Sequence, residues 1–367
     1  MPEWTRCRHS WAAMRIDRQQ AFSGTTASDI DAAALEAYLS RNLDGFAGPL
    51  TLARFKGGQS NPTYKLTTHG GSYVLRRKPF GKLLPSAHAI EREYRVTEAL
   101  ARAGFPVARP LHLCADDGII GAAFYVMAHA GGRVFWEPHA PGLSGTERAA
   151  LFDSLNAAIA QLHLLDPLAL GLGGFGKPQG YVARQIKRWS EQYRASETET
   201  IAEMNSLIAW LPDACPADSG AAIVHGDFRL DNCIVHPAEP RVIAVLDWEL
   251  STLGDPLADF TYHLMQWFMP VSETGAGVGS LLGHEREPGV PAIDAYIADY
   301  CRRTGRSGIP DLPIYMAYNF FRLAAILQGI LGRVRDGTAA NGDAAAMARQ
   351  VRPLAETAWS FARKAGA

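Results

Sequence analysis

The chain has 367 residues, of which 47% are hydrophobic and 20% are charged, and its formal net charge is −1. It is long enough to bury more than one hydrophobic core, while the near-neutral charge gives no electrostatic reason to expect nucleic acid or an anionic membrane as a partner. No apolar run approaches the ~20 residues that span a bilayer. The five cysteines are scattered without a paired spacing, which favours a reducing cytoplasm over a disulfide framework or a zinc site.

The chain opens with a stretch, residues 1–27, that carries several arginines but no continuous apolar segment. We expect a loose tail there and no secretory signal. Leu35, Leu39 and Leu43 then recur at helical spacing, which predicts a first helix. Across residues 50–78, short apolar runs alternate with glycine-bearing turns, which predicts a series of strands.

Helical periodicity returns over residues 86–103, and the pair Phe105-Pro106 ends this second helix. Two further apolar runs, over residues 108–114 and 119–127, indicate strands. The first third of the chain is therefore predicted to be rich in strands and interrupted by one main helix.

The pattern becomes mostly helical after Gly131-Gly132. We therefore expect an α+β chain with two lobes. The N-lobe, over residues 28–130, would be small, antiparallel and β-rich, with one main helix. The C-lobe, over residues 131–367, would be larger and mainly helical.

A glycine-rich segment separates two of the predicted N-lobe strands. Gly57 and Gly58 would let the backbone approach phosphate oxygens closely and present N–H donors, while Ser60 and Asn61 add polar groups. The segment is neither a Walker A loop nor the spaced dinucleotide fingerprint. Because adjacent glycines in hairpins are mostly structural, the segment alone leaves phosphate binding and a plain turn as open alternatives.

The strand predicted just before the second helix ends in three cations, Arg76, Arg77 and Lys78. Period-two alternation places Arg76 and Lys78 on one face. In the helix that follows, Glu93 lies on the mostly apolar, core-facing stripe, where a carboxylate needs a partner. We predict that Arg76 is this partner, with Lys78 second, although charge runs of this kind usually belong to a solvated strand end.

The most informative segment is His225-Gly226-Asp227, followed by Asn232 and later by Asp247. Two short β-branched runs, over residues 233–235 and 242–246, are separated by prolines and predict a hairpin that brings Asn232 and Asp247 together. Phosphoryl transfer to a hydroxyl needs a carboxylate for the acceptor's proton and oxygen ligands for Mg²⁺. These residues therefore predict a small-molecule kinase.

Other polar residues near this segment are expected to be structural. We interpret His225 as a histidine that organises the loop, because Asp227 already supplies a base. His163 follows an apolar helical stripe and is expected to be a satisfied core histidine. Asp255 and Asp259, at the start of a predicted helix, are interpreted first as elements of the fold.

Taken together, these motifs resemble the aminoglycoside phosphotransferase and choline kinase superfamily, which has the protein-kinase-like fold. Within it, further segments look most like the kinase-like domain at the front of acyl-CoA dehydrogenase family members 10 and 11, which also occurs as a stand-alone bacterial protein. That domain is associated with phosphorylating the hydroxyl of 4-hydroxyacyl-CoA. The segments that carry the resemblance are Gly57-Gly58-Gln59-Ser60-Asn61-Pro62-Thr63-Tyr64, Val74-Leu75-Arg76, Arg92-Glu93, Leu83-Leu84-Pro85-Ser86-Ala87-His88, Tyr125-Val126-Met127, Gly132-Arg133-Val134-Phe135-Trp136, Leu162-His163, Arg184-Gln185-Ile186-Lys187-Arg188-Trp189, His225-Gly226-Asp227 with Asn232, Asp247-Trp248-Glu249 and Gly254-Asp255-Pro256-Leu257-Ala258-Asp259.

The resemblance implies ATP and Mg²⁺ as cofactors, a nucleotide-binding N-lobe, and a C-lobe that carries the catalytic and substrate-binding groups. It implies that Asp227 is the catalytic base, that Asn232 and Asp247 are magnesium ligands, and that Arg76, oriented by Glu93, binds the nucleotide phosphates. It also assigns nucleotide binding to two segments. These are Gly57, Gly58, Gln59, Ser60 and Asn61 over the phosphates, and Met127, Ala128 and His129 in the hinge facing adenine.

Two residues depart from what the resemblance leads us to expect. Arg76 stands where protein kinases have lysine. A guanidinium would bind the phosphate through two N–H groups, whereas a lysine ammonium would bind it as a single point charge. Ala128 stands where an acidic residue is expected after Met127, which puts the adenine contacts there in doubt.

A basic cluster in the C-lobe is the candidate acceptor-binding segment, with Arg184, Arg188 and Trp189 as its members. A CoA ester carries several phosphates that such a cluster could bind. A solvated helix face with acidic neighbours such as Glu191 explains the same residues equally well.

Three functions follow as hypotheses. The first is an ATP-dependent kinase of a hydroxyacyl-CoA, with no dehydrogenase domain fused in this chain. The second is a phosphotransferase for an aminoglycoside or for another small alcohol such as choline. The third is a nucleotide-binding module without catalysis, against which the presence of Asp227, Asn232 and Asp247 argues.

Overall fold

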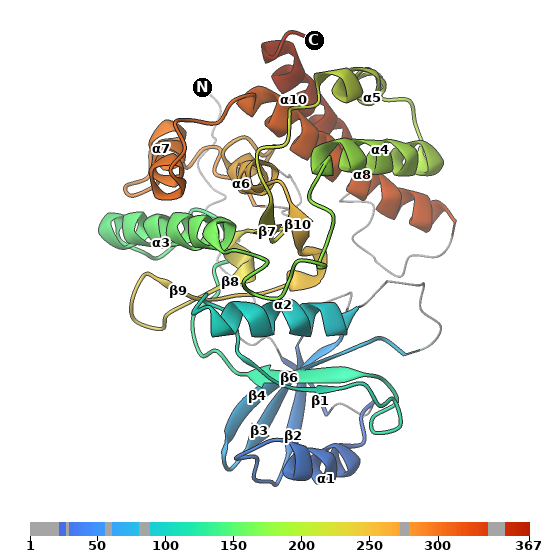
Figure 1. The fold of residues 1–367 in the computed structure, drawn as a ribbon, viewed down its shortest axis with the longest axis vertical. Helices are drawn as coiled ribbons and strands as arrows, with labels where there is room; N and C mark the ends of the chain where they lie inside the picture. The colour runs from blue at the N-terminus through green and yellow to red at the C-terminus, as the bar shows by residue number, and fades with distance from the viewer. Residues whose placement is uncertain (1–21, 27–28, 56–60, 81–88, 272–278, 337–348) are drawn as a thin grey trace, which may run out of the picture. The chain divides into compact units, whose positions relative to one another are not determined.

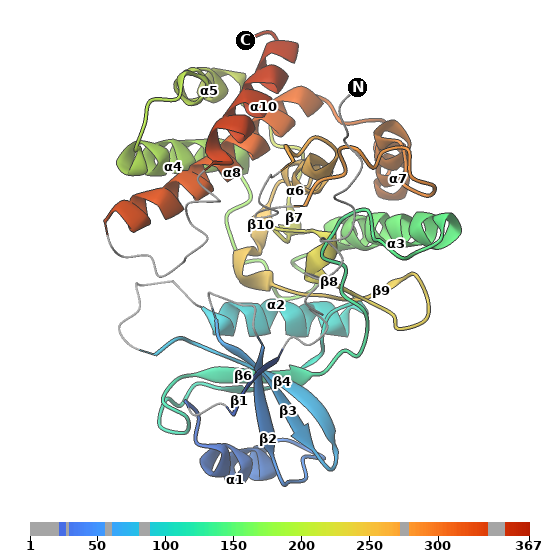
Figure 2. The same ribbon diagram turned by 180° about the vertical axis from the view of Figure 1, so that it is seen from behind.

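The structure is a computed structural model that describes residues 22–26, 29–55, 61–80, 89–271, 279–336 and 349–367. The chain divides into two compact units (Figures 1 and 2), and each is described by itself. Unit 1 comprises Met1–Tyr94 and Arg109–His129, and unit 2 comprises Arg95–Ala108 and Ala130–Ala367. The smaller unit is β-rich and the larger one mainly helical, so the predicted α+β organisation is confirmed.

Unit 1 is built on a six-stranded sheet with the order β1-β2-β3-β4-β6-β5, in which all neighbours are antiparallel. Its helices are α1 and the beginning of α2. The elements are β1 (Phe22–Thr26), α1 (Ala32–Asn42), β2 (Thr51–Phe55), β3 (Thr63–Thr68), β4 (Gly71–Arg77), α2 (Ile90–Arg102), β5 (Pro110–Cys114) and β6 (Phe124–Ala128).

The two faces of this sheet pack against different helices. Leu35 and Leu39 of α1 share a buried cluster with alternate strand residues such as Leu75 and Val126. On the other face Ile90 of α2 packs with Tyr125. Tyr125 precedes Val126 in β6, so the two side chains point to opposite faces of the sheet. The period-two alternation of β6 therefore gives both of its faces an apolar cover.

One part of the predicted tail is corrected by the structure. Residues 22–26 form β1, which pairs with β2, whereas we expected a loose tail over residues 1–27. The strand was missed because its sequence, Phe-Ser-Gly-Thr-Thr, has a single large apolar side chain and hence no readable alternation. Residues 1–21 lie outside the described part of the chain.

Unit 2 contains seven named helices among its described residues, two small antiparallel strand pairs and three short 3-10 turns. The strand pairs are β7 with β10, and β8 with β9. The elements are α3 (Gly145–Leu164), α4 (Tyr181–Ser196), α5 (Ala202–Ala214), β7 (Ala222–Val224), η1 (Leu230–Asn232), β8 (Cys233–Val235), β9 (Val242–Val245), η2 (Trp248–Leu250), β10 (Thr252–Gly254), α6 (Pro256–Leu264), η3 (Met265–Trp267), α7 (Ile293–Thr304), α8 (Leu312–Arg335) and α10 (Val351–Lys364).

The central helix of unit 2 is α8, which lies against α4, α6 and α10 (Figure 1). Contrary to our expectation from the sequence, α8 is long and apolar enough to cross a membrane by length and composition alone, yet 72% of its most apolar window is buried inside the unit. Burial of this kind is typical of a core helix, because its apolar side chains are already covered by protein.

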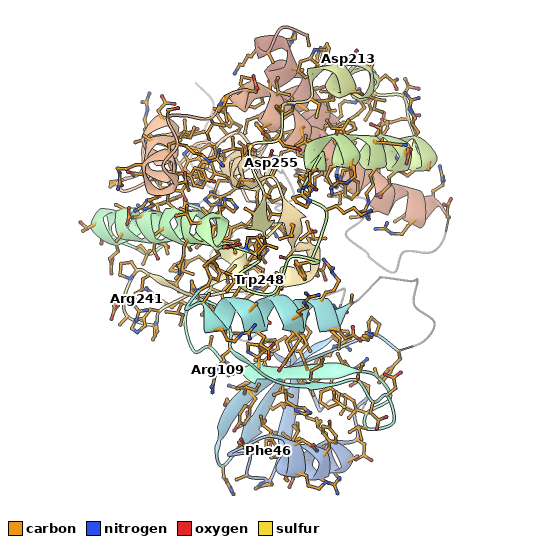
Figure 3. All side chains as sticks on the ribbon, viewed as in Figure 1. Phe46, Arg109, Asp213, Arg241, Trp248 and Asp255 are labelled. Atoms are coloured by element: carbon orange, nitrogen blue, oxygen red, sulfur yellow. The ribbon has the colours of Figure 1, made fainter. Side chains whose placement is uncertain are left out.

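Helix α6 begins at a heavily bonded cap. The carboxylate of Asp255 accepts from the backbone N–H groups of Leu257 (2.8 Å) and Ala258 (3.2 Å), and from the Tyr315 hydroxyl (3.1 Å). Ser219 binds the same carboxylate with its backbone N–H and its hydroxyl. Asp255 therefore has a structural role, as predicted: it caps and fixes the start of α6 (Figure 3). Helix α6 also carries Asp259 and Tyr262.

Candidate active site

The loop after β7 is anchored by a buried carboxylate of α6. Asp259 accepts from the backbone N–H groups of His225 and Gly226, both at 2.8 Å, and lies 3.1 Å from Nε2 of His163. Burial alone would raise the pKa of Asp259, but the hydrogen bond and charge of His163, with those of His225, hold the pKa below its usual range. Nδ1 of His163 lies 2.8 Å from the Tyr300 hydroxyl, so His163 is the satisfied core histidine that we predicted.

The backbone of this loop needs a glycine. Gly226 has φ +84°, in the left-handed region, and a Cβ there would lie 3.0–3.1 Å from Cβ and the carbonyl oxygen of Leu250. His225, fully buried, contacts the Leu246 carbonyl with Nε2 (2.8 Å) and accepts from the backbone N–H of Asp227 with Nδ1 (3.2 Å). The prediction that His225 organises the loop is confirmed.

The carboxylate of Asp227 is surrounded by donors. Its Oδ1 accepts from the Tyr262 hydroxyl at 2.7 Å and forms an ion pair with Nε of Arg229 at 3.0 Å. Its Oδ2 accepts from Nδ2 of Asn232 at 3.1 Å. The side chain is still 20% exposed, so Asp227 is held in one orientation while it remains accessible to solvent.

Asn232 and Asp247 lie at the open end of the predicted hairpin, which is confirmed. Cys233 pairs with Val245, and the Leu246 N–H donates to the Asn232 carbonyl at 2.8 Å, so Asp247 is the next residue beyond this pairing. Asn232 uses Nδ2 for Asp227, which turns its amide oxygen toward other partners. An amide oxygen and a carboxylate are the ligand types that Mg²⁺ takes, so these residues fit a divalent cation.

Negative charge is in excess at this corner of unit 2. Arg229 is partly buried, which would lower its pKa, but the charges of Asp227, Tyr262, Asp231 and Asp247 raise the pKa above its ordinary value. Burial raises the pKa of Asp231. One guanidinium among three carboxylates leaves a net negative field, which favours a bound cation.

A small, solvent-open hollow with an enclosed volume of about 20 Å³ lies in unit 2, next to the residues that hold Asp227. Its walls combine apolar side chains with a few polar groups, as small-molecule sites do. They are Trp136, Pro138, Arg229, Leu230, Asp231, Tyr262, His263, Met265, Gln266, Met269 and Gly279. Arg229 and Tyr262, which both contact Asp227, are thus shared between the carboxylate and the hollow.

The candidate acceptor-binding residues lie elsewhere. Arg184 donates to the backbone carbonyls of Lys177 and Gln179, and the Arg188 guanidinium lies 5.1 Å from the centre of the Trp189 ring. All three belong to α4, and none lines the hollow beside Asp227. Sequence reasoning instead missed Tyr262 and Arg229 as partners of Asp227.

In unit 1 the predicted partner of Glu93 is confirmed. Nε of Arg76 forms an ion pair with Glu93 Oε2 at 2.8 Å, and Glu93 also accepts from Asn61 (2.8 Å) and Tyr125 (3.2 Å). Lys78, the second choice, pairs with Glu91 instead. With Glu93 only 2% exposed, this buried network gives Arg76 a fixed direction.

The remaining nucleotide-binding candidates are only partly described. Gly57, Gly58, Gln59 and Ser60 lie outside the described residues. Met127 and Ala128 end β6 and His129 follows it. The backbone N–H of Ala128 donates to the Arg109 carbonyl and that of His129 to the Ser72 carbonyl, so both amides are engaged within unit 1. The assignments to nucleotide binding therefore stay predictions.

Fold and motifs together define a phosphotransferase. The model of the phosphotransferase enzyme family matches residues 51–309, and the chain belongs to this family. The predicted resemblance is thereby confirmed.

Within this family, the chain is similar to the acyl-CoA dehydrogenase family members 10 and 11. Acyl-CoA dehydrogenase family member 10 of Mus musculus is 44% identical over 338 residues, which cover 91% of this chain and 31% of the relative. Family member 11 of Gallus gallus is also 44% identical, over 91% of this chain and 44% of the relative. The chain thus spans less than half of the length of these relatives, 31% of the first and 44% of the second.

Among solved structures, a protein of Ralstonia eutropha JMP134, provisionally named an aminoglycoside phosphotransferase, is 48% identical. It has a TM-score of 0.82 and covers 91% of this chain and 99% of its own. A thermostable aminoglycoside phosphotransferase mutant in ternary complex with ADP and hygromycin B is 16% identical, with a TM-score of 0.58 and coverage of 89% of this chain and 98% of its own. Choline kinase of Cryptosporidium parvum is 11% identical, with a TM-score of 0.55 and coverage of 91% of this chain and 95% of its own. The last two likenesses show the fold alone.

Removal of the Tyr262 hydroxyl tests how Asp227 is oriented. In Tyr262→Phe, Oδ1 of Asp227 loses its 2.7 Å donor, which corresponds to about 1 kcal/mol and hence roughly a five- to tenfold fall in kcat. The KM for nucleotide should not change. Tyr38→Phe, which removes a hydroxyl 2.9 Å from His112 in unit 1, is the matched control. Equal kinetics for the two variants would contradict the orienting role.

The buried histidine in the wall of the hollow should make stability depend on pH. Burial lowers the pKa of His263 to about 4, below the ~6.5 of an unfolded chain. The fold therefore favours the neutral ring, and its stabilisation, at most about 3 kcal/mol, is present above pH ~6.5 and is lost as the pH falls toward 4.

Urea unfolding at about pH 7.0, 5.5 and 4.5, which lie above and within the interval between about 6.5 and about 4, measures most of this loss. His263→Gln retains an amide that can bond the Tyr296 hydroxyl, the native partner at 2.8 Å, and should flatten the slope. The exposed His69, replaced by Gln, should leave the slope as it is in the wild type. If His263→Gln and His69→Gln gave the same slope, the role of His263 would be refuted.

Proposed function

We propose that this phosphotransferase moves the γ-phosphoryl group of ATP, with Mg²⁺, to the hydroxyl of a small molecule bound in the hollow beside Asp227. The single observation that carries the proposal is the position of Asp227. A carboxylate fixed by Tyr262 and Asn232 lies next to the end of the hairpin that bears Asp247, and its partners Tyr262 and Arg229 line a solvent-open hollow.

Each residue has a separate task in this proposal. Bound Mg²⁺ would neutralise charge on the nucleotide phosphates. Asp227 accepts the proton of the acceptor hydroxyl, while Asn232 and Asp247 present oxygen atoms to the metal. In unit 1, Arg76, held by Glu93, binds nucleotide phosphates together with the segment from Gly57 to Asn61.

For the acceptor we propose a hydroxyacyl-CoA of the 4-hydroxyacyl type, handled in the cytoplasm. The names of the relatives that are 44% identical refer to acyl-CoA chemistry, and apolar walls from Trp136, Met265 and Met269 suit an acyl chain. The wall carries Asp231 as well as Arg229, so it is the apolar walls and the acyl-CoA names of the relatives, and not charge, that rank a CoA ester above an aminoglycoside or choline. Other small alcohols fit the same chemistry.

Nucleotide turnover measured against a panel of acceptors tests the proposed class. The panel contains 4-hydroxyacyl-CoA esters of several chain lengths, the free hydroxy acids, choline and aminoglycosides, each with Mg²⁺ and ATP. We expect ADP release to be stimulated by the CoA esters. Arg188, proposed to bind the phosphates of CoA away from the hollow, is tested in the same assay: Arg188→Gln should weaken the stimulation by CoA esters and leave the stimulation by free hydroxy acids unchanged. Stimulation by choline or an aminoglycoside alone would move the proposal to another class, and nucleotide binding without turnover of any acceptor would indicate a module without catalysis.

Two aspartate substitutions separate the assigned roles. Asp227→Ala should lower kcat by at least ~10²-fold while sparing nucleotide affinity, because a positioned base contributes about 10²–10⁴-fold. Asp247→Ala should instead weaken the binding of magnesium-nucleotide, measured by calorimetry. Asp213→Ala, at an exposed position on α5 (Figure 3), is the control. Wild-type phosphorylation by both active-site variants would overturn the assignment.

A further inference from the structure

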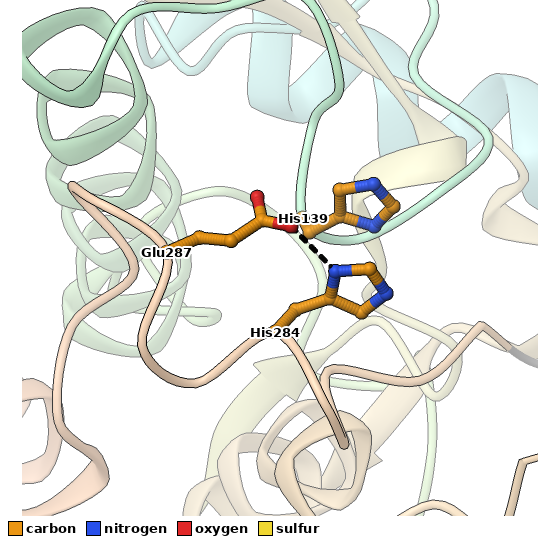
Figure 4. Close-up of side chains that lie close together, drawn as sticks. All are labelled: His139, His284 and Glu287. Carbon is orange, nitrogen blue, oxygen red and sulfur yellow. Dashed lines mark hydrogen bonds and ion pairs between the residues drawn. The ribbon is translucent and has the colours of Figure 1, made fainter.

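Two loops of unit 2 that line the hollow meet at a pair of histidines. Trp136 and Pro138 belong to the loop before α3, and Gly279 belongs to the loop before α7. Just beyond these residues the rings of His139 and His284 stack, with centroids 3.8 Å apart and planes 3° from parallel. Figure 4 shows that Glu287 reaches the same point from the second loop.

These three side chains offer metal-ligand atoms close to one another. A nitrogen of each histidine and a carboxylate oxygen of Glu287 all lie within 4.8 Å of each other. Nδ1 of His284 is 2.6 Å from Oε1 of Glu287. His284 and Glu287 are 36% and 34% exposed, and His139 is 12% exposed. An ion could therefore enter from solvent.

The frame that holds these side chains is built by a buried arginine. Arg148, 7% exposed, donates from Nε to the His139 carbonyl at 2.6 Å and from Nη1 to the Pro288 carbonyl. Its Nη2 lies 3.4 Å from Oε2 of Glu287. The backbone is therefore fixed at His139 and beside Glu287, and the arginine engages Oε2 while Oε1 faces His284.

A second carboxylate orients the other histidine. Oε2 of Glu137 lies 3.3 Å from Nε2 of His139. A proton on Nε2 that is shared with Glu137 leaves Nδ1 of His139 with a lone pair. Metal-binding histidines usually have such a carboxylate or carbonyl on the nitrogen that does not bind the ion.

We propose that His139, His284 and Glu287 form a binding site for a divalent transition-metal ion of the zinc class, distinct from the magnesium site at Asn232 and Asp247. Two imidazole nitrogens and one carboxylate oxygen suit Zn²⁺ or Co²⁺ and not Mg²⁺, which prefers an all-oxygen shell. Three protein ligands leave the fourth tetrahedral position to water.

Binding requires the two rings to turn. Because the rings are parallel, their in-plane lone pairs cannot meet at one ion, so at least one ring rotates about its Cβ–Cγ bond. That torsion is broad for histidine, and the backbone bonds of Arg148 do not oppose it. The ion then replaces the stack and the bond between His284 and Glu287 as the link between the two loops.

The consequence for the hollow rests on the proposed function. An ion that joins the loops bearing Trp136, Pro138 and Gly279 stiffens one wall of the acceptor site. Saturation with Zn²⁺ should therefore change the KM for the acceptor by several-fold and leave the KM for the nucleotide as it was.

Metal binding itself is tested without nucleotide or acceptor, so the result does not depend on kinase activity. The full chain, without an affinity tag and stripped with a chelator, is titrated with Zn²⁺, Co²⁺ or Mg²⁺ in a calorimeter. We expect one equivalent of Zn²⁺ to bind with a micromolar or lower Kd, Co²⁺ to give the visible absorption of a tetrahedral site, and Mg²⁺ not to compete for this site.

Three variants locate the ion. His284→Gln and Glu287→Gln, which preserves the shape of the carboxylate, should each weaken Zn²⁺ binding by at least ~10-fold, while the exposed His69→Gln should not. Circular dichroism of the chelated proteins identifies any variant that fails to fold, and the other variant then decides. No stoichiometric Zn²⁺ binding, or binding retained in the folded variants, would mean that the stacked histidines are only a hydrogen-bonded contact between two loops.

Discussion

The buried carboxylate of Asp259 is the contact on which the candidate active site depends. Its two oxygens accept from the backbone N–H groups of His225 and Gly226 at 2.8 Å each, and Nε2 of His163 lies 3.1 Å from the same carboxylate. A buried carboxylate without partners would be strongly unfavourable. Here it is fully engaged, so the loop can take the left-handed turn at Gly226 that aims Asp227 at solvent.

The same helix fixes both the backbone and the side chain of the candidate base. Asp259 and Tyr262 are three residues apart on α6, and hence on neighbouring positions of one face. One binds the backbone of the loop and the other the Asp227 carboxylate. Because Asp255 anchors the start of α6, the cap, the loop anchor and the orienting hydroxyl all belong to a single rigid element.

Much of this arrangement could be predicted from sequence because it follows local rules. The hairpin from Asn232 to Asp247 was visible as two β-branched runs, and the Arg76–Glu93 pair as a carboxylate on an apolar helical stripe. Tyr262 was missed because its bond to Asp227 joins residues 35 apart in sequence, and a tyrosine on an apolar helix usually indicates core. The histidine pair, His139 with His284, was invisible for the same reason: neither loop has a motif, and only tertiary packing brings them together.

The donors around Asp227 constrain how an acceptor hydroxyl can reach it. An ionised carboxylate has about four lone-pair sites, and Tyr262, Asn232 and both Nε and Nη2 of Arg229 already approach it. A hydroxyl that donates its proton must therefore take the place of one donor. Arg229 is the donor that can yield, since its Nη2 contact is the longest at 3.4 Å and its guanidinium has a second partner in Asp231 at 3.3 Å. An acceptor that carries a carbonyl or an anionic group near its hydroxyl would draw Arg229 toward itself and expose the base, whereas a cationic acceptor would not.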